Sequence, residues 1–193
     1  MPVDENFHIV ISYVDELPVS WLDEFQEDLK HHDLNVMVKS RPNSVFASLE
    51  WTLPTLVIAY LTKPYFDGFL KEAGKNHYQI LKTGIGKLLK RLYGTNPEER
   101  SARYSMMFSI VVPIHAGQSL KFVFPEGVTH EEYNLITLEA LNLIENYFIT
   151  ETVTIEKKST TYLVWIPEKQ TWEELDVNAA IIEAHDKQNK PKI

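Results

Sequence analysis

The sequence predicts one α/β domain built on a central, mostly parallel sheet. Short apolar runs rich in β-branched residues alternate with stretches whose apolar residues recur at helical spacing. The chain has 193 residues, 44% of them hydrophobic, which is enough to bury one core, and its 7 Gly and 10 Pro are too few for a disordered or fibrous protein. Because alternating strands and helices typically form right-handed βαβ units, we expect a parallel sheet covered on both faces.

The first part of the chain alternates strand, helix and strand. Residues 7–13 form an apolar run that predicts a buried first strand. Ser20 is a suitable N-cap for a helix whose apolar stripe continues to Leu29. Residues 34–38 and 54–61 then predict the second and third strands.

The middle of the chain predicts a long helical stretch and two more strands. Residues 64–93 have helical spacing, and we expect Gly84 and Gly86 to break or bend the helix. Residues 107–114 and 120–124 predict the fourth and fifth strands. The predicted main α/β domain therefore ends near residue 128.

The remaining residues, 129–193, predict an extension made of a helix, a hairpin and a helix. Thr129 caps a long amphipathic helix. Residues 153–156 and 161–166 predict a β-hairpin, and residues 171–186 predict a last helix. We expect this extension to pack on the same core as residues 1–128, either as a lid that completes the core or as an interface for a partner.

Composition excludes several classes of function. A chain with no cysteine has no disulfides and no thiolate zinc site, and its seven histidines lack metalloprotease spacing, so we expect no metal. Its 27 acidic and 19 basic residues give a net charge of −8, which argues against a nucleic-acid partner. The first residues do not resemble a signal peptide and no apolar run is long enough for a membrane span, so we expect a cytoplasmic protein without a membrane partner.

Familiar catalytic motifs are missing. The segment Gly84-Ile85-Gly86-Lys87 lacks both the third glycine of a dinucleotide fingerprint and the Lys-Ser/Thr pair of a Walker loop. No Gly-x-Ser-x-Gly sequence marks a serine hydrolase. Function must therefore be sought in the arrangement of the elements.

That arrangement has a recognisable order. It consists of a strand ending Ile11-Ser12-Tyr13-Val14-Asp15, a helix with Trp21 and Leu29, the loop Ser40-Arg41-Pro42-Asn43, an apolar strand leading to residues 65–72, and the strand Val111-Val112-Pro113-Ile114. This order, over residues 7 to 125, resembles a divergent bacterial-type TIR domain, although no piece is specific alone. The resemblance implies a flavodoxin-like three-layer sandwich.

The resemblance also implies a reaction. Enzymatic TIR domains cleave the nicotinamide-ribose bond of NAD, which would be a substrate and not a cofactor, and Glu72 matches the catalytic glutamate of the family. A carboxylate suits this step because the breaking bond develops oxocarbenium character. Two features depart from the family: Phe66-Asp67-Gly68-Phe69 replaces Ser-x-Trp-Cys, and a turn replaces a helix after Ile114. Glu72 is otherwise explained as a solvated surface group.

Other candidate substrate-binding residues follow from position, since ligands in open α/β sheets bind beyond the carboxyl ends of the strands. Ser12 and Tyr13 end the first strand, Arg41 follows the second, and Tyr65 and Phe66 follow the third. An aromatic ring would stack on nicotinamide or adenine, and Arg41 would meet a phosphate. The alternative for Tyr65 and Phe66 is ordinary core packing.

Three functions remain open from the sequence. The chain is a TIR-like signalling or defence domain that hydrolyses NAD, a non-catalytic interaction module of the same fold, or a nucleoside deoxyribosyltransferase-like enzyme in which Glu72 is the nucleophile. TIR-like domains commonly self-associate, so the resemblance implies a homo-oligomer or a protein partner. A nucleotide is the small molecule that the enzymatic hypotheses require.

Overall fold

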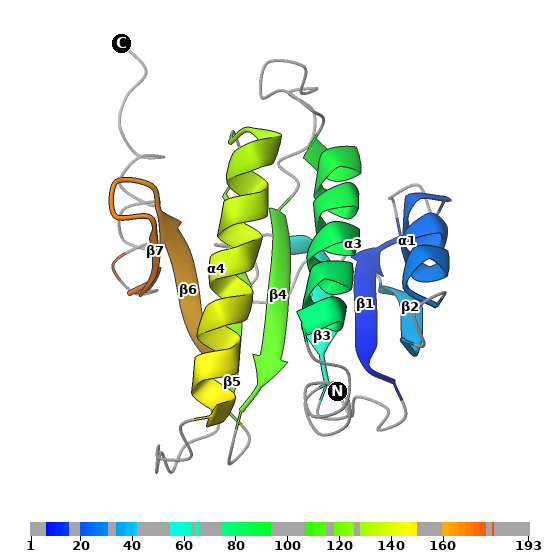
Figure 1. The fold of residues 1–193 in the computed structure, drawn as a ribbon, viewed down its shortest axis with the longest axis horizontal. Helices are drawn as coiled ribbons and strands as arrows, with labels where there is room; N and C mark the ends of the chain where they lie inside the picture. The colour runs from blue at the N-terminus through cyan, green and yellow to red at the C-terminus, as the bar shows by residue number, and fades with distance from the viewer. Residues whose placement is uncertain are drawn as a thin grey trace.

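The computed structural model of the chain (Figure 1) describes residues 7–15, 20–30, 34–41, 55–62, 65, 75–93, 107–114, 118–125, 128–149, 160–176 and 179. The strands within these residues are β1 (Ile9–Val14), β2 (Val36–Arg41), β3 (Thr55–Leu61), β4 (Met107–Pro113), β5 (Ser119–Val123), β6 (Thr160–Ile166) and β7 (Thr171–Glu174). The helices are α1 (Ser20–Lys30), α3 (Lys75–Tyr93) and α4 (His130–Ile149).

The described strands form one seven-stranded sheet in the order β2-β1-β3-β4-β5-β6-β7. The order of the first five strands is that of flavodoxin-like folds. The predicted flavodoxin-like α/β sandwich is therefore confirmed. The segment beyond residue 128 contributes α4, β6 and β7, and β6 and β7 extend the same sheet.

The strand directions divide this sheet into three βαβ units. The pairs β1–β2, β3–β4 and β5–β6 are parallel, whereas β1–β3, β4–β5 and β6–β7 are antiparallel. We expected β3 to continue the parallel arrangement of the first two strands, and that expectation is wrong. Because β3 runs against β1, β2 ends and β3 begins at the same edge of the sheet, so the chain between them does not have to cross back along the sheet.

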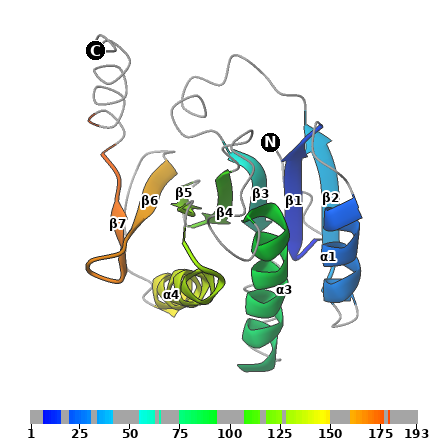
Figure 2. The same ribbon diagram turned by 90° about the horizontal axis from the view of Figure 1, so that it is seen from above.

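The three described helices all lie on one face of the sheet (Figure 2). The units β1–α1–β2 and β3–α3–β4 are right-handed, as expected, but β5–α4–β6 is left-handed (Figures 1 and 2). The reason is geometric. Strand β5 runs in the same direction as β1, yet the chain moves from β5 towards the opposite edge of the sheet while its helix stays on the same face.

The hairpin formed by β6 and β7 is held to the core by Trp172; of the hairpin expected at 153–156 and 161–166, residues 153–156 lie outside the described residues. The indole Nε1 of Trp172 donates a hydrogen bond to the carbonyl of Ile136 in α4 at 3.3 Å, and its ring packs edge-on against Phe122 at 5.1 Å between centroids. Residues 171–174 were expected to begin a helix, which is wrong. The chain reverses through residues 167–170, where Gln170 has a φ of 50°, and pairs back onto β6, with Trp172 buried in the core.

Glycine in α3 serves helix packing. The expectation that Gly84 and Gly86 break the helix is wrong, since α3 continues through both to Tyr93. A Cβ atom on Gly84 would lie 3.0 Å from Cδ2 of Leu29 and 3.2 Å from Cε2 of Phe25 in α1. The absence of a side chain at position 84 therefore lets α1 and α3 approach closely.

Polar groups form hydrogen bonds with one another at the end of the sheet where β1 begins and β3 finishes. The backbone N–H of Asn35 donates to Nδ1 of His8 at 3.0 Å, and the N–H of Thr62 donates to the carbonyl of His8 at 3.1 Å. The hydroxyl of Thr62 also donates to the carbonyl of Phe7. Burial lowers the pKa of His8 from its ordinary value of 6.5, which favours the neutral ring that can accept the bond from Asn35.

We expect Gly84→Val to destabilise the fold by about 2 kcal/mol, because the branched side chain would overpack the contact with Leu29 and Phe25. Chemical denaturation measures the free energy of unfolding. Thr83→Val, at the exposed neighbouring position, is the matched control and should change it little. Equal effects of the two substitutions would contradict the close packing of α1 and α3.

We expect protonation of His8 to destabilise the fold as the pH falls below 6.5. The unfolded chain takes up this proton more readily than the folded chain, so the contribution of His8 is complete above 6.5 and decreases as the pH falls towards the lowered folded pKa. His8→Asn keeps an acceptor that does not titrate. The difference in unfolding free energy between wild type and His8→Asn should shrink on acidification, and a constant difference would contradict the assignment.

Candidate functional site

The two faces of the sheet differ in chemistry. Along β1, Ile9, Ile11 and Tyr13 join the hydrophobic core beneath the helices, while the alternate residues point to the opposite face. We call this opposite side the polar face. Its polar residues are Ser12 in β1, Lys39 and Arg41 in β2, Tyr60 in β3, Ser109 in β4, Lys121 in β5 and Tyr162 in β6. Buried apolar residues, among them Val10, Val14, Ile58 and Val123, lie between them.

This polar face is shielded, although no described helix lies on it. Val10, Ser12 and Ile58 are each less than 5% exposed, and Ser109 is fully buried. Lys39, Arg41 and Tyr60 are half-buried. Polar side chains on this face are therefore partly or fully buried. Burying a polar group costs free energy, and binding sites are places where proteins commonly do so.

One corner of the polar face is built by the parallel pair β1–β2. Ser12 lies opposite Lys39 in the ladder, and Val14 lies opposite Arg41. The N–H of Asp15 donates to the carbonyl of Arg41 at 3.2 Å and so continues the ladder to the last residue of β2. The carboxyl ends of two adjacent parallel strands thus present a hydroxyl, an ammonium and a guanidinium group on one side of the sheet.

The charges on this face are positive over most of the sheet, with Glu173 of the edge strand β7 as the exception. From β2 to β6, the charged strand residues that the structure describes on the polar face are Lys39, Arg41 and Lys121. The whole chain carries a net charge of −8. A local gathering of cations in an acidic protein creates a positive potential that attracts anions.

Lys121 is a buried cation that the sequence analysis did not single out. The residue is 4% exposed, and its Nζ lies 5.5 Å from the ring centroid of Tyr162, its direct neighbour in β6. The ring face stabilises an ammonium group that has lost water. The strand Ser119–Val123 alternates polar and apolar residues, which is the signal that could have marked Lys121, but alternation usually indicates a solvated face.

The structure brings together only part of the predicted site. Ser12 and Arg41 meet on the polar face. Tyr13 and Tyr65 belong to the apolar core on the helix side, at 8% and 2% exposure, and Tyr65 follows β3 at the opposite edge, where its N–H donates to the carbonyl of Thr62. Tyr13 lies five residue steps along the chain from His8 at that edge, which corresponds to about 17 Å. Phe66 and Glu72 lie outside the described residues.

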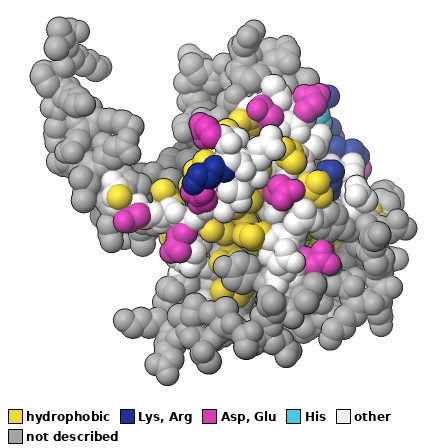
Figure 3. Space-filling view, turned by 60° about the vertical axis from the view of Figure 1, so that its left-hand side comes forward, with side chains coloured by type: hydrophobic (Ala, Val, Ile, Leu, Met, Phe, Trp, Pro, Cys, Tyr) yellow, Lys and Arg dark blue, Asp and Glu magenta, His cyan; other side chains and the backbone are white. Residues whose placement is uncertain are grey.

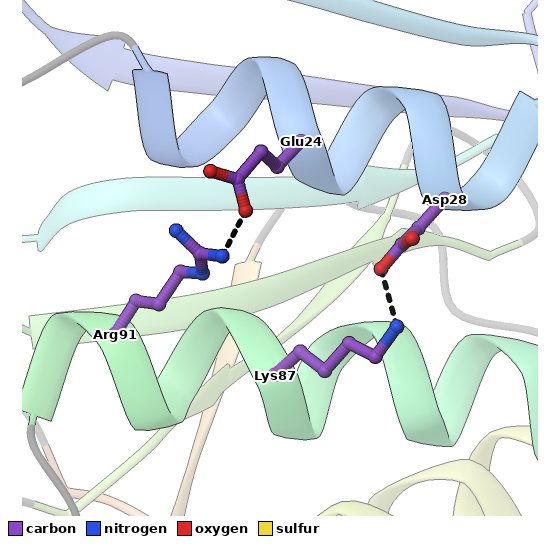
Figure 4. A network of polar contacts seen from close by, with 4 residues as sticks. All are labelled: Glu24, Asp28, Lys87 and Arg91. Carbon is purple, nitrogen blue, oxygen red and sulfur yellow. Dashed lines mark hydrogen bonds and ion pairs between the residues drawn. The ribbon is translucent and has the colours of Figure 1, made fainter.

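A second candidate is the hollow between α1 and α3 (Figure 4). It encloses about 550 Å³ and is crossed by two ion pairs, Asp28 with Lys87 at 2.6 Å and Glu24 with Arg91. Both pairs are exposed, and each acid already neutralises a base. These ion pairs therefore stabilise the contact between α1 and α3 only weakly, and their charges are already neutralised and do not favour a charged ligand.

Metal binding has no support among the described residues, which contain no group of three or more His, Cys, Asp or Glu side chains placed to hold an ion. None of the helices in this part of the chain is long and apolar enough to cross a membrane.

Comparison of the chain with protein-family models, with curated proteins and with solved structures gave no match. The class of protein is defined by the fold itself: an α/β domain with a mixed seven-stranded sheet, one apolar face under helices and one polar face.

Proposed function

We propose that this domain binds a phosphate-bearing nucleotide on the polar face, at the corner where β1 and β2 end. One observation carries the proposal: Ser12, Lys39 and Arg41 gather on one side of two adjacent parallel strands in an otherwise acidic chain. The carboxyl ends of parallel strands are the usual ligand position in open α/β sheets.

The chemistry of these groups suits a phosphate. A guanidinium group donates two parallel hydrogen bonds to phosphate oxygens, and an ammonium group adds a point charge. Lys121 on β5 lies four strands away from Lys39 and Arg41 on β2, about 19 Å across the sheet. The adjacent phosphates of a pyrophosphate cannot reach both cationic positions, so Lys39 and Arg41 alone would hold the phosphate group of a mononucleotide or of a dinucleotide such as NAD.

The TIR-like resemblance extends the proposal to catalysis. The bound NAD would be hydrolysed at its nicotinamide-ribose bond, with the carboxylate of Glu72 stabilising the oxocarbenium-like transition state. Nicotinamide leaves already positively charged, so no strong general acid is needed. Without turnover, the same domain would be a TIR-like signalling module, and with nucleosides as substrates it would be deoxyribosyltransferase-like.

We expect Arg41→Gln to weaken binding of ADP-ribose about tenfold or more, because it removes a charge-assisted bidentate contact. Isothermal titration calorimetry at low and high salt measures the effect, and wild-type affinity should fall with salt. Lys90→Gln on an exposed position of α3 is the control for loss of one positive charge. Absence of binding by wild type, or equal affinity of Arg41→Gln, would refute the proposed corner.

We expect Glu72→Gln to abolish nicotinamide release from NAD while leaving the fold intact, because the substitution keeps the shape of the side chain and removes its charge. The assay uses concentrated protein, since enzymes that need assembly are inactive when dilute. Glu27→Gln, on an exposed position of α1, is the matched control. No release by wild type would exclude the hydrolase, and cleavage of nucleosides alone would favour the deoxyribosyltransferase-like alternative.

A further inference from the structure

The two outermost strands of the sheet, β2 and β7, have directions that would let them pair between two copies of the chain. In the described part of the chain, each of them pairs with a single neighbour. Following the pairings across the sheet, β7 runs opposite to β2. If a second copy stood beside the first in the same orientation, its β2 would therefore lie antiparallel to β7, the commoner direction of strand pairing.

On both outermost strands, every second residue directs its backbone N–H and C=O groups away from the sheet. On β2, the carbonyls of Asn35 and Arg41 accept bonds from β1, so the alternate residues Val36, Val38 and Ser40 direct their backbone groups outward. The Val36 carbonyl already accepts a bond from Nε2 of Gln26 at 2.7 Å, so only Val38 and Ser40 enter the pairing with β7. On β7, the N–H of Leu175 donates to Tyr162 at 2.8 Å, so Trp172 and Glu174 direct theirs outward.

The side chains of the same residues lie on matching faces. Val36 and Trp172 belong to the core on the helix side. Residues that face each other in an antiparallel ladder project their side chains to the same side. Pairing the outward residues of β7 with those of β2 would therefore keep the helices of both copies on one face and continue the sheet.

Charge favours the pairing of β7 with β2 over the pairing of β2 with β2 or of β7 with β7. If Trp172 is placed opposite Ser40 of a second copy, Glu173 falls directly opposite Lys39 on the polar face, with Arg41 diagonal to it. Pairing of β2 with β2 would gather four cations, and pairing of β7 with β7 would gather acids. Acidic side chains also occur across the side of the molecule to which β7 belongs (Figure 3).

We infer that this protein assembles head to tail, with β7 of one copy pairing with β2 of the next. The contact is heterologous, so it repeats and gives a ring or an open filament and not a closed dimer. Only Trp172 and Glu174 offer outward backbone groups on β7, so the association is weak and depends on concentration. The exposed ion pair between Lys169 and Glu173, at 2.6 Å, costs little to exchange for a contact with Lys39.

Sedimentation velocity over a range of protein concentrations tests the inference by reversing the charges of each edge. The variants Lys39→Glu/Arg41→Glu and Glu173→Lys/Glu174→Lys should each remain monomeric where wild type assembles. The quadruple variant that combines them should assemble again, because the complementarity is restored with inverted sign. Lys30→Glu/Lys90→Glu, at exposed helix positions, controls for the change in net charge and should assemble like wild type.

A second variant tests the backbone contact without altering charge. Ser40→Pro removes an outward N–H of β2 and leaves the ladder with β1 intact, so it should also keep the protein monomeric. Circular dichroism and melting curves verify that each variant is folded.

The outcomes separate this inference from the nucleotide proposal, in which Lys39 and Arg41 also take part. The quadruple variant loses both cations, so it should assemble without binding ADP-ribose. A wild type that stays monomeric when concentrated, a closed dimer, or a folded quadruple variant that stays monomeric would overturn the head-to-tail assembly, whatever the result of the binding assay.

Discussion

The antiparallel pairing of β1 with β3 determines which residues of this sheet can meet. Five backbone pairs, from Ile9 with Leu61 to Tyr13 with Val57, fix it. With β3 reversed, the carboxyl ends of β1 and β2 share one edge, and the chain leaving β3 starts from the other. Tyr65 therefore packs near the start of β1, and Ser12 and Arg41 are left as a separate corner. The same reversal gives β7 the direction opposite to that of β2.

The difference between the two faces of the sheet follows from what each face packs against. On the helix side, apolar residues such as Phe108, Ile110 and Phe122 are fully buried and supply the hydrophobic free energy of folding. On the other side, buried polar and cationic groups must keep hydrogen bonds or ring contacts, as Lys121 does with Tyr162. The helix side thus supplies the main hydrophobic cluster, and the cationic side chains lie on the other side, between buried apolar residues such as Val10 and Ile58.

Several elements could be predicted because their signals are local. The strand at Ile9–Val14 is a continuous apolar run, and α4 begins at a capping box in which Thr129 and Glu132 bond each other's backbone N–H groups. Gly84 was mispredicted because its local preference is not the deciding factor. Glycine weakens an isolated helix, but here contact with Leu29 and Phe25 in α1 outweighs that preference.

The sequence by itself determined the α/β class, the approximate positions of β1 to β5, and Ser12 as a residue near the end of the first strand. Arg41 was expected in the loop after the second strand, whereas it is the last residue of β2, because the ladder with β1 continues to that residue. Hydrophobic periodicity and capping act over a few residues, and each signal is complete within one segment. Strand direction, the hand of each crossover, the strand at Thr171–Glu174 and the burial of Lys121 were decided only in the tertiary structure. Each of these depends on which distant segment lies alongside, and such pairings leave no mark within the segment itself.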